Sequence, residues 1–219
     1  TKSQTFLSSL RSNRKVVDEH GLPRKVRVSI GSAVVLGLAE SRLDAKPTTV
    51  YMLTYRRVKC SASCAFCPQS VVSTGRADLL SRVIWPAFQT KEVVPRVAEA
   101  FEKGKIKRAC IQALNYAGVQ DDLIRLASII RSLSEVAISV SCQPLNDKDM
   151  YRLAEVGVER VSIALDAVTK KLFDEVKGPL IGGPYTWEGH FEALKKAVGI
   201  FGRRHVTTHL IVGLGESEE

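Results

Sequence analysis

Apolar and polar positions along the chain follow two different periods. Short runs rich in β-branched residues predict strands at 48–55, 106–114, 136–143, 158–166 and 205–213. Between these runs, apolar positions recur at helical spacing and predict helices near 90–103, 119–133, 146–156, 168–177 and 187–201. Strands and helices that alternate in this order are typical of parallel βαβ units. With no sheet reversal evident, five such units predict an α/β fold with a complete or partial parallel barrel.

The N-terminal residues follow a different pattern. Residues 4–20 are amphipathic at helical spacing and end at Gly21 and Pro23, whereas residues 24–38 are β-rich. We therefore predict an N-terminal helical and β-rich extension over residues 1–46, lying over one end of a barrel core formed by residues 47–219. The core ends at VGLGESEE, just after its fifth strand, where a loop and a helix should follow. We expect the core to be incomplete at its C-terminus.

Alternation within the predicted strands separates an outer face from an inner face, because successive side chains point to opposite sides. In residues 158–166, Val161, Ile163 and Leu165 share the face expected under the helices. The same alternation directs small or polar side chains inward, namely Cys110, Gln112, Ser139, Ser141, Gln143, Ser162, Ala164, Asp166, Thr207, His209, Ile211 and Gly213. A purely structural barrel would have branched apolar residues inside. This interior therefore predicts a catalytic cavity, while Cys142 is expected as a buried thiol on the outer face.

Composition and charge restrict the class of protein. The 219 residues are 45% hydrophobic and 25% charged, as in an ordinary globular domain. No apolar run reaches the roughly 18 residues of a membrane helix, and no secretory signal is present, which predicts a soluble cytoplasmic protein. The net charge is +9, with basic residues concentrated in residues 1–27. This basic surface is either a solvated face or a dock for an acidic partner; no RNA-binding signature supports nucleic acid.

Three of the five cysteines lie in the stretch KCSASCAFCPQS, at Cys60, Cys64 and Cys67. An odd number, crowded in this way, argues against a disulfide framework and favours metal or redox chemistry. A structural zinc site needs four ligands, yet no fourth Cys or His lies nearby. Three thiolates can instead bind three irons of a 4Fe-4S cluster and leave the fourth iron open. The loop also follows the first barrel strand, at the end where barrel active sites form.

The pattern CxxxCxxC, with Phe66 just before the last cysteine, resembles the radical S-adenosylmethionine (SAM) superfamily. CPQS, FDEVKG with PYTWE, and IVGLGE extend the resemblance over residues 48–219, to biotin synthase and lipoyl synthase-like proteins of the archaeal biotin-synthase-related type. The resemblance implies that the open iron binds the amino and carboxylate groups of SAM. An electron from the cluster then cleaves SAM to methionine and a 5′-deoxyadenosyl radical, which abstracts a substrate hydrogen. It also implies an electron donor such as a ferredoxin or flavodoxin.

The resemblance implies a set of SAM contacts by position. They are Phe66, Asn115, Tyr116, Asp166, Ile211 and Gly213. Phe66 and Ile211 would contact adenine, Asp166 would bind the ribose, and Gly213 would permit close backbone approach. The amino group of SAM would lie at Asn115 and Tyr116. Two alternatives stay open: Asp166 as the N-cap of the following helix, and Ile211 as a core residue.

Several positions depart from biotin synthase. That family holds a second, sacrificial cluster with inward cysteines on three strands, and the matching residues here are Cys110, Ser139 and Thr207. Cys110 is thus either a buried thiol or a ligand of an auxiliary iron–sulfur cluster. His209 replaces a glycine and Ala164 an asparagine of the family. His209 is either a hydrogen-bonded interior histidine or a contact to substrate or cluster.

Within this family we expect a lipoyl or biotin synthase-like sulfurtransferase that inserts sulfur into a carrier-bound octanoyl chain. Its partners would be an acidic lipoyl-carrier protein and a second radical SAM subunit. Two alternatives stay open. One is a radical isomerase or lyase without sulfur insertion, and the other is a non-enzymatic iron–sulfur or zinc protein that acts in protein interactions.

Overall fold

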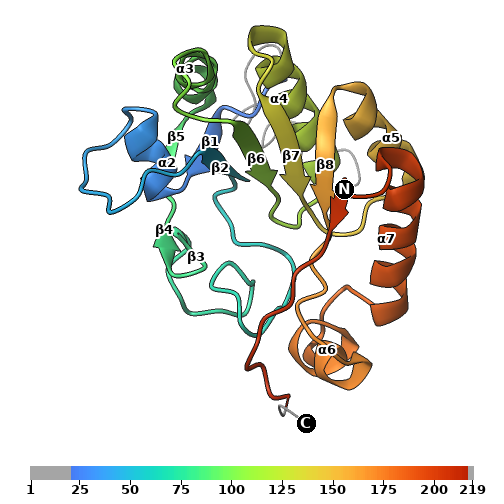
Figure 1. Ribbon diagram of the computed structural model, residues 1–219. Coiled ribbons are helices and arrows are strands. Elements are labelled where there is room, and N and C mark those ends of the chain that lie inside the picture. The colour runs from blue at the N-terminus through green and yellow to red at the C-terminus, as the bar shows by residue number, and fades with distance from the viewer. Residues whose placement is uncertain (1–20, 217–219) are drawn as a thin grey trace, which may run out of the picture.

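The computed structural model describes residues 21–216 and shows an α/β fold built on a mostly parallel, curved sheet (Figure 1). The strands are β1 (Lys25–Val28), β2 (Thr49–Thr54), β3 (Leu79–Leu80), β4 (Val83–Ile84), β5 (Ala87–Gln89), β6 (Arg108–Gln112), β7 (Ala137–Ser141), β8 (Val158–Ser162) and β9 (Val206–Thr207). The helices are α2 (Ile30–Val35), α3 (Thr90–Glu102), α4 (Val119–Leu133), α5 (Asp147–Glu155), α6 (Lys170–Val176), the 3₁₀ helix η1 (Pro179–Ile181) and α7 (Trp187–Phe201).

The main sheet has the strand order β5-β1-β2-β6-β7-β8-β9. Strands β2, β6, β7, β8 and β9 are parallel neighbours, which confirms the predicted partial parallel barrel. Figure 1 shows α3, α4, α5 and α7 along the outer side of the curved sheet. The antiparallel edge was not predicted: β1, which lies within the β-rich residues 24–38, pairs with β2, and β5, for which no strand was expected, pairs with β1.

The β-rich expectation for residues 24–38 is wrong beyond the first few residues. Only Lys25–Val28 form a strand, and residues 30–35 form α2. Ser32 and Ala33 are the buried residues of this helix. The Ser32 hydroxyl there accepts a hydrogen bond from the Tyr51 backbone N–H at 2.9 Å. The predicted helix over residues 4–20 lies outside the described residues.

The fifth barrel strand is much shorter than the sequence predicts. Strand β9 covers only Val206–Thr207 instead of residues 205–213. Its ladder is interrupted because the Leu165 backbone N–H donates to the side-chain Oγ1 of Thr208, at 3.0 Å, rather than to a backbone carbonyl. A single bridge between Asp166 and Leu210 continues the pairing. Residues 208–211 therefore lie beside the end of β8 as a loop and can contribute side chains to the site.

The main hydrophobic core lies between the sheet and the outer helices. Val161 and Ile163 are buried there while Ser162 and Ala164 are only half-buried on the inner face, as the alternation predicts. Cys142 also belongs to this core. Val26 and Val28 of β1 join the same core, so part of residues 1–46 is integrated with the barrel, although the domain boundary itself stays a prediction. None of the helices that the structure describes is long and apolar enough to cross a membrane.

Candidate functional site

The cysteine segment lies in a long loop between β2 and β3, at the edge where the parallel strands end (Figure 1). Lys59 folds this loop back on itself. Its Nζ donates hydrogen bonds to the backbone carbonyls of Pro68 at 3.1 Å, Ser73 at 2.6 Å and Gly75 at 2.6 Å. A single ammonium has three donors, so Lys59 satisfies three loop carbonyls at once.

Gln69 attaches the same loop to the β3–β4 hairpin. Its side chain is 2% exposed, and Nε2 donates to the carbonyls of Ala77 at 2.7 Å and Leu79 at 2.6 Å. The Gln69 carbonyl accepts from the Cys60 backbone N–H at 2.9 Å. Buried polar groups require partners, so this glutamine fixes the start of the cysteine segment against the hairpin.

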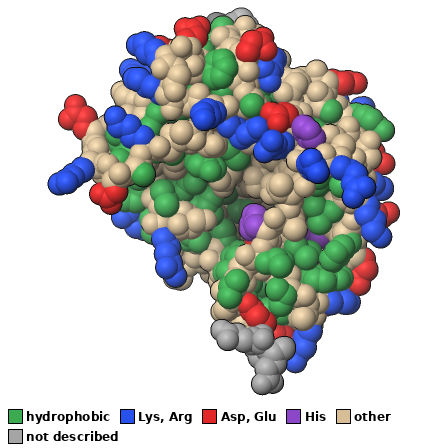
Figure 2. All heavy atoms as spheres, in the orientation of Figure 1, with side chains coloured by type: hydrophobic (Ala, Val, Ile, Leu, Met, Phe, Trp, Pro, Cys, Tyr) green, Lys and Arg blue, Asp and Glu red, His purple; other side chains and the backbone are tan. Residues whose placement is uncertain are grey.

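The three loop cysteines share one cavity of about 710 Å³. It is bounded by the cysteine loop, the β3–β4 hairpin and the ends of β6, β7 and β8. Its lining includes Cys60, Cys64, Phe66, Cys67, Leu79, Leu80, Gln112, Asn115, Ser141, Ala164, Asp166, Lys177, Tyr185, His209 and Ile211. Figure 2 shows this face of the molecule hollowed near its middle, with hydrophobic side chains around the hollow.

The donor set suits an iron–sulfur cluster. Within residues 21–216, no three His, Cys, Asp or Glu side chains are arranged to hold a single metal ion. A 4Fe-4S cluster does not need three side chains that converge on one ion, because each thiolate binds a different iron atom of the cluster. All five cysteines are free thiols, and thiolate is a soft ligand that selects iron–sulfur clusters or zinc over hard cations.

Burial opposes thiolate formation in this cavity, and nearby groups counteract it. Burial raises the pKa of Cys64 to about 12, and the Lys177 ammonium is the main opposing influence. Burial also raises the pKa of Cys67, while the Gln69 backbone N–H opposes the rise. The Cys60 sulfur accepts a hydrogen bond from the Asn115 backbone N–H at 3.1 Å. Binding of a cationic cluster would therefore have to displace protons from buried thiols, with help from these donors.

Asp166 follows β8 and is 5% exposed. Its Oδ2 lies 2.7 Å from Lys177 Nζ and its Oδ1 lies 3.2 Å from His209 Nε2. Burial alone would raise the pKa of Asp166, but His209 and Lys177 outweigh it and hold the pKa below its ordinary value. The helix-cap alternative is wrong, because the N-cap of α6 is Thr169, whose side chain accepts from the Leu172 N–H.

Lys177 is the site residue that the sequence analysis missed. It ends α6, is 6% exposed, and also donates to the Ala164 carbonyl at 2.5 Å. After Lys177 the chain turns back so tightly that Gly183 lies against the Lys177 backbone. A Cβ on Gly183 would lie 1.9 Å from the Lys177 carbonyl oxygen. The sequence signal was a lysine followed by glycine at the end of a predicted helix. That pattern is typical of an exposed helix end and does not indicate a buried ammonium.

Residues 57–219 match the model of the radical SAM superfamily. The chain belongs to this superfamily. Membership implies a 4Fe-4S cluster and SAM, and it supports a radical SAM enzyme over a non-enzymatic interaction protein. It does not distinguish a lipoyl or biotin synthase-like subtype from other radical SAM enzymes. No curated protein matches the chain.

Solved radical SAM structures share this fold. Methylornithine synthase (PylB) is 11% identical with a TM-score of 0.58; the match covers 96% of this chain and 56% of the PylB chain. The [FeFe]-hydrogenase maturase HydG from Carboxydothermus hydrogenoformans is 15% identical with a TM-score of 0.57, covering 84% of this chain and 45% of its own. Another HydG structure is 17% identical with a TM-score of 0.56; the match covers 71% of this chain and 33% of the HydG chain. This chain thus spans between a third and just over half of those proteins, and the likeness shows the fold alone.

Most of the predicted SAM contacts of this radical SAM chain gather in one place. Phe66, Asn115, Asp166 and Ile211 line the cavity of the three cysteines. Gly213 is outside that lining and is exposed, with a positive φ of 88°. The structure thus brings together segments that are up to 145 residues apart, from Phe66 to Ile211.

Tyr116 does not line the cavity of the cysteines. Its hydroxyl donates to Asp122 Oδ2 at 2.7 Å, and the Arg56 guanidinium lies 4.6 Å from its ring centroid. Burial raises the pKa of Tyr116, so the hydroxyl keeps its proton. Of the two residues predicted near the amino group of SAM, only Asn115 lines the cysteine cavity.

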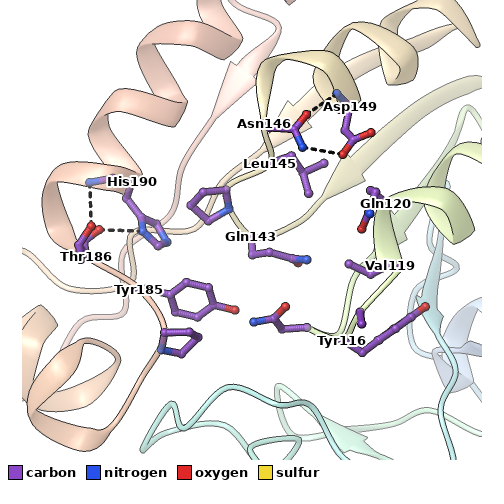
Figure 3. A pocket seen from close by; sticks show the side chains of 16 residues that line it. Tyr116, Val119, Gln120, Gln143, Leu145, Asn146, Asp149, Tyr185, Thr186 and His190 are labelled. Atoms are coloured by element: carbon purple, nitrogen blue, oxygen red, sulfur yellow. Dashed lines mark hydrogen bonds between the residues drawn. The ribbon is translucent and has the colours of Figure 1, made fainter. Parts of the chain in front are cut away.

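Tyr116 instead lines a second cavity of about 590 Å³, which shares Asn115, Gln143 and Tyr185 with the first. Figure 3 shows Gln143 and Tyr185 projecting into the space between the N-terminal ends of α5 and α7. His190 also lines this cavity and is 1% exposed. Burial, aided by the Lys177 ammonium, lowers the pKa of His190 to about 4, so its imidazole is neutral at pH 7.

His209 and Cys110, whose roles the sequence left open, differ in position. His209 lines the cysteine cavity with its side chain 55% exposed, so it is hydrogen bonded to Asp166 but not enclosed in the interior. Cys110 does not line this cavity. It pairs with Ser139 across β6 and β7, and burial raises its pKa while the Ser139 hydroxyl opposes the rise.

Proposed function

We propose that Cys60, Cys64 and Cys67 bind one 4Fe-4S cluster, and that SAM binds beside it in the 710 Å³ cavity. The observation that carries this proposal is that the three thiols line one cavity together with predicted SAM contacts from three other segments. The bound groups would supply an electron that cleaves SAM to methionine and a 5′-deoxyadenosyl radical, which abstracts hydrogen from substrate. The electron would come from a ferredoxin or flavodoxin-like donor.

The protein's own residues would position SAM. Phe66 and Ile211 both line the cavity and would offer apolar surface to the adenine. Asp166 accepts from Lys177 and His209, yet an ionised carboxylate has about four acceptor sites, which leaves capacity for the two ribose hydroxyls. Asn115, whose backbone N–H already contacts the Cys60 sulfur, would bind the amino group of SAM.

An aliphatic substrate suits the hairpin side of the cavity. Leu53, Leu79 and Leu80 line it there, facing the charged side formed by Asp166 and Lys177. Apolar walls favour an alkyl chain, and the small Ser141 and Ala164 leave room for it. We therefore propose sulfur insertion into an octanoyl chain, carried by an acidic lipoyl-carrier protein that the net charge of +9 would attract. A second radical SAM subunit would complete the reaction.

A radical isomerase or lyase is the second candidate, and Cys110 favours it. The inner positions that would hold an auxiliary cluster are Cys110, Ser139 and Thr207, so only one thiol is available. Cys110 is moreover hydrogen bonded to the Ser139 hydroxyl and does not line the cavity. A sulfur-inserting enzyme would then need its sulfur donor from a partner, whereas an isomerase or lyase would need none.

The experiment uses anaerobically reconstituted protein and a carrier domain whose attached octanoyl chain is deuterated. We expect about four irons per chain, SAM cleavage under reduction, and deuterium in 5′-deoxyadenosine. Replacing all three loop cysteines with Ala should abolish iron uptake and SAM cleavage, while Cys110→Ala should retain both. SAM cleavage by the triple variant would overturn the cluster assignment. Cleavage without deuterium transfer, with every partner tried, would favour the isomerase or lyase.

A further inference from the structure

The 590 Å³ cavity lies directly beside the cysteine cavity. A shared wall of three residues, Asn115, Gln143 and Tyr185, lines both cavities. Asn115 follows β6, Gln143 follows β7, and Tyr185 lies between β8 and α7. The wall is thus assembled from three separate segments, at the edge where the parallel strands end. A ligand in the cysteine cavity therefore meets the second cavity at these three side chains.

Gln143 is the residue of this shared wall that has no partner. The Asn115 side chain is hydrogen bonded to the Tyr185 hydroxyl. The Asn115 carbonyl accepts from the Ser61 backbone N–H and from Ser61 Oγ, both at 2.9 Å. Within residues 21–216, the half-buried Gln143 side chain makes no hydrogen bond, and Figure 3 shows it projecting into the space of the second cavity. Its carbonyl and NH₂ groups are thus available to a ligand.

The lining of the second cavity is polar but almost free of charge. It includes Gln120 and His190, which is neutral at pH 7, and no Lys or Arg of the described residues lines it. Asp149 does line it, but Oδ1 accepts from Arg152 Nη1 and Oδ2 from Asn146 Nδ2, both at 2.9 Å. An anion would therefore lie there without a cation, and a cation would meet a carboxylate that already has partners. The lining favours a neutral group that both donates and accepts hydrogen bonds.

We propose that the 590 Å³ cavity binds a neutral amide at the end of the substrate's alkyl chain, and that Gln143 selects for this amide. The inference rests on the proposed function, in which the alkyl chain lies in the cysteine cavity. An amide has one N–H donor and one carbonyl acceptor, and the Gln143 side chain offers the matching carbonyl and NH₂. An acyl chain joined to a lysine of a carrier protein carries such an amide at the end of the chain.

The test is a calorimetric titration of anaerobically reconstituted protein with SAM bound and no reductant, so that binding is measured without turnover. The two probes are end-capped Nε-octanoyl-lysine and its ester analogue, in which oxygen replaces the amide N–H. We expect the wild type to bind the amide about tenfold more tightly, because the ester leaves the Gln143 carbonyl without its donor. Gln143→Met should bind both probes with equal affinity.

The matched control is Gln112→Met. Gln112 ends β6 and lines the cysteine cavity but not the second cavity. The variant should therefore keep the tenfold preference for the amide, whatever its effect on the affinity for both probes.

Gln143→Glu covers the case in which Gln143→Met does not fold. Glutamate keeps the length and the acceptor of glutamine but loses the NH₂ donor. It should bind both probes more weakly than the wild type, because their carbonyls lose a donor, and still prefer the amide.

Two results would overturn the inference and leave the cluster and SAM assignment intact. They are equal affinity of the wild type for amide and ester, and a tenfold preference that persists in Gln143→Met. Binding of neither probe, at normal iron content and with SAM bound, would overturn the inference together with the octanoyl substrate. A wild-type protein that takes up no iron would overturn the proposed function itself.

Discussion

Lys177 Nζ and Asp166 Oδ2 lie 2.7 Å apart, with each side chain only 7% exposed. The pair joins the end of α6 to the loop after β8, and Asp166 holds a positive φ of 68° there. A non-glycine residue in this region costs of order 1 kcal/mol or more, so surrounding contacts must hold it in place. The Lys177 ion pair and the backbone bonds of Asp166 to His209 and Ile211 do so.

Asp166→Asn should destabilise the protein strongly, because it leaves the Lys177 ammonium buried without its counter-ion. Removing one partner of a buried pair costs about 3–5 kcal/mol. Urea unfolding of the iron-free protein at pH 7 measures this directly. The double variant with Lys177→Met should recover part of the loss. A single variant as stable as wild type would show that the pair is not a structural element.

His190 should make stability depend on pH in the acidic range. Its folded pKa of about 4 lies below the ordinary value of 6.5, so the unfolded chain binds the proton more tightly. Stability is therefore full above about pH 6.5 and falls as pH decreases toward 4, by at most about 3 kcal/mol. His190→Phe keeps ring contacts to Phe173 and Tyr185.

The measurement for His190 is urea unfolding at pH 7 and pH 5 in both proteins. The difference between the two pH values should be smaller in His190→Phe than in wild type. Equal differences would mean that the imidazole is accessible to protons in the folded state.

Lys59→Met should loosen the cysteine loop, because three backbone carbonyls lose their donor. Hydrogen bonds to a charged group contribute about 1.5–3 kcal/mol when well formed, so the loop should open more often without unfolding the barrel. Hydrogen exchange of residues 68–75 should become faster. Lys103→Met, in an exposed pair with Glu99, is the control and should leave this exchange unchanged. Unaltered exchange in Lys59→Met would contradict the role of the ammonium.

Gly183→Ala should destabilise the segment that carries Lys177, since its Cβ would lie 1.9 Å from a backbone oxygen. Backbone atoms cannot move aside as a flexible side chain can, so we expect a loss above about 2 kcal/mol. Gly199→Ala is the matched control. Gly199 lies inside α7 with open space at its Cβ, so alanine should stabilise there by about 0.5–1 kcal/mol. Thermal unfolding of both variants decides the comparison, and equal midpoints would contradict it.

The amino-acid pattern alone predicted the parallel part of the fold and located the cysteine segment. Periodicity predicted α4 and α7 at their observed bounds because both helices carry a regular apolar face along their whole length. The cysteine spacing is local, so three thiols within eight residues were visible without any structure. Strand alternation also placed Gln112 of β6 and Ser141 of β7 on the face that lines the cavity, because the period of two holds wherever a strand is straight.

Which charges meet depends on long-range packing. Lys177 and Asp166 lie on segments whose local patterns indicate a helix end and a strand end, and nothing in either pattern couples them. The antiparallel pairing of β1 with β5 was likewise not predicted, because these strands are only 4 and 3 residues long, too short for a period to show which strand each one pairs with. Tyr116 was predicted beside the amino group of SAM, but its hydroxyl bonds to Asp122, since a side chain's direction in a loop depends on its partners rather than on alternation. The sequence specifies which chemical groups are present, and long-range packing then selects which of them share the cavity.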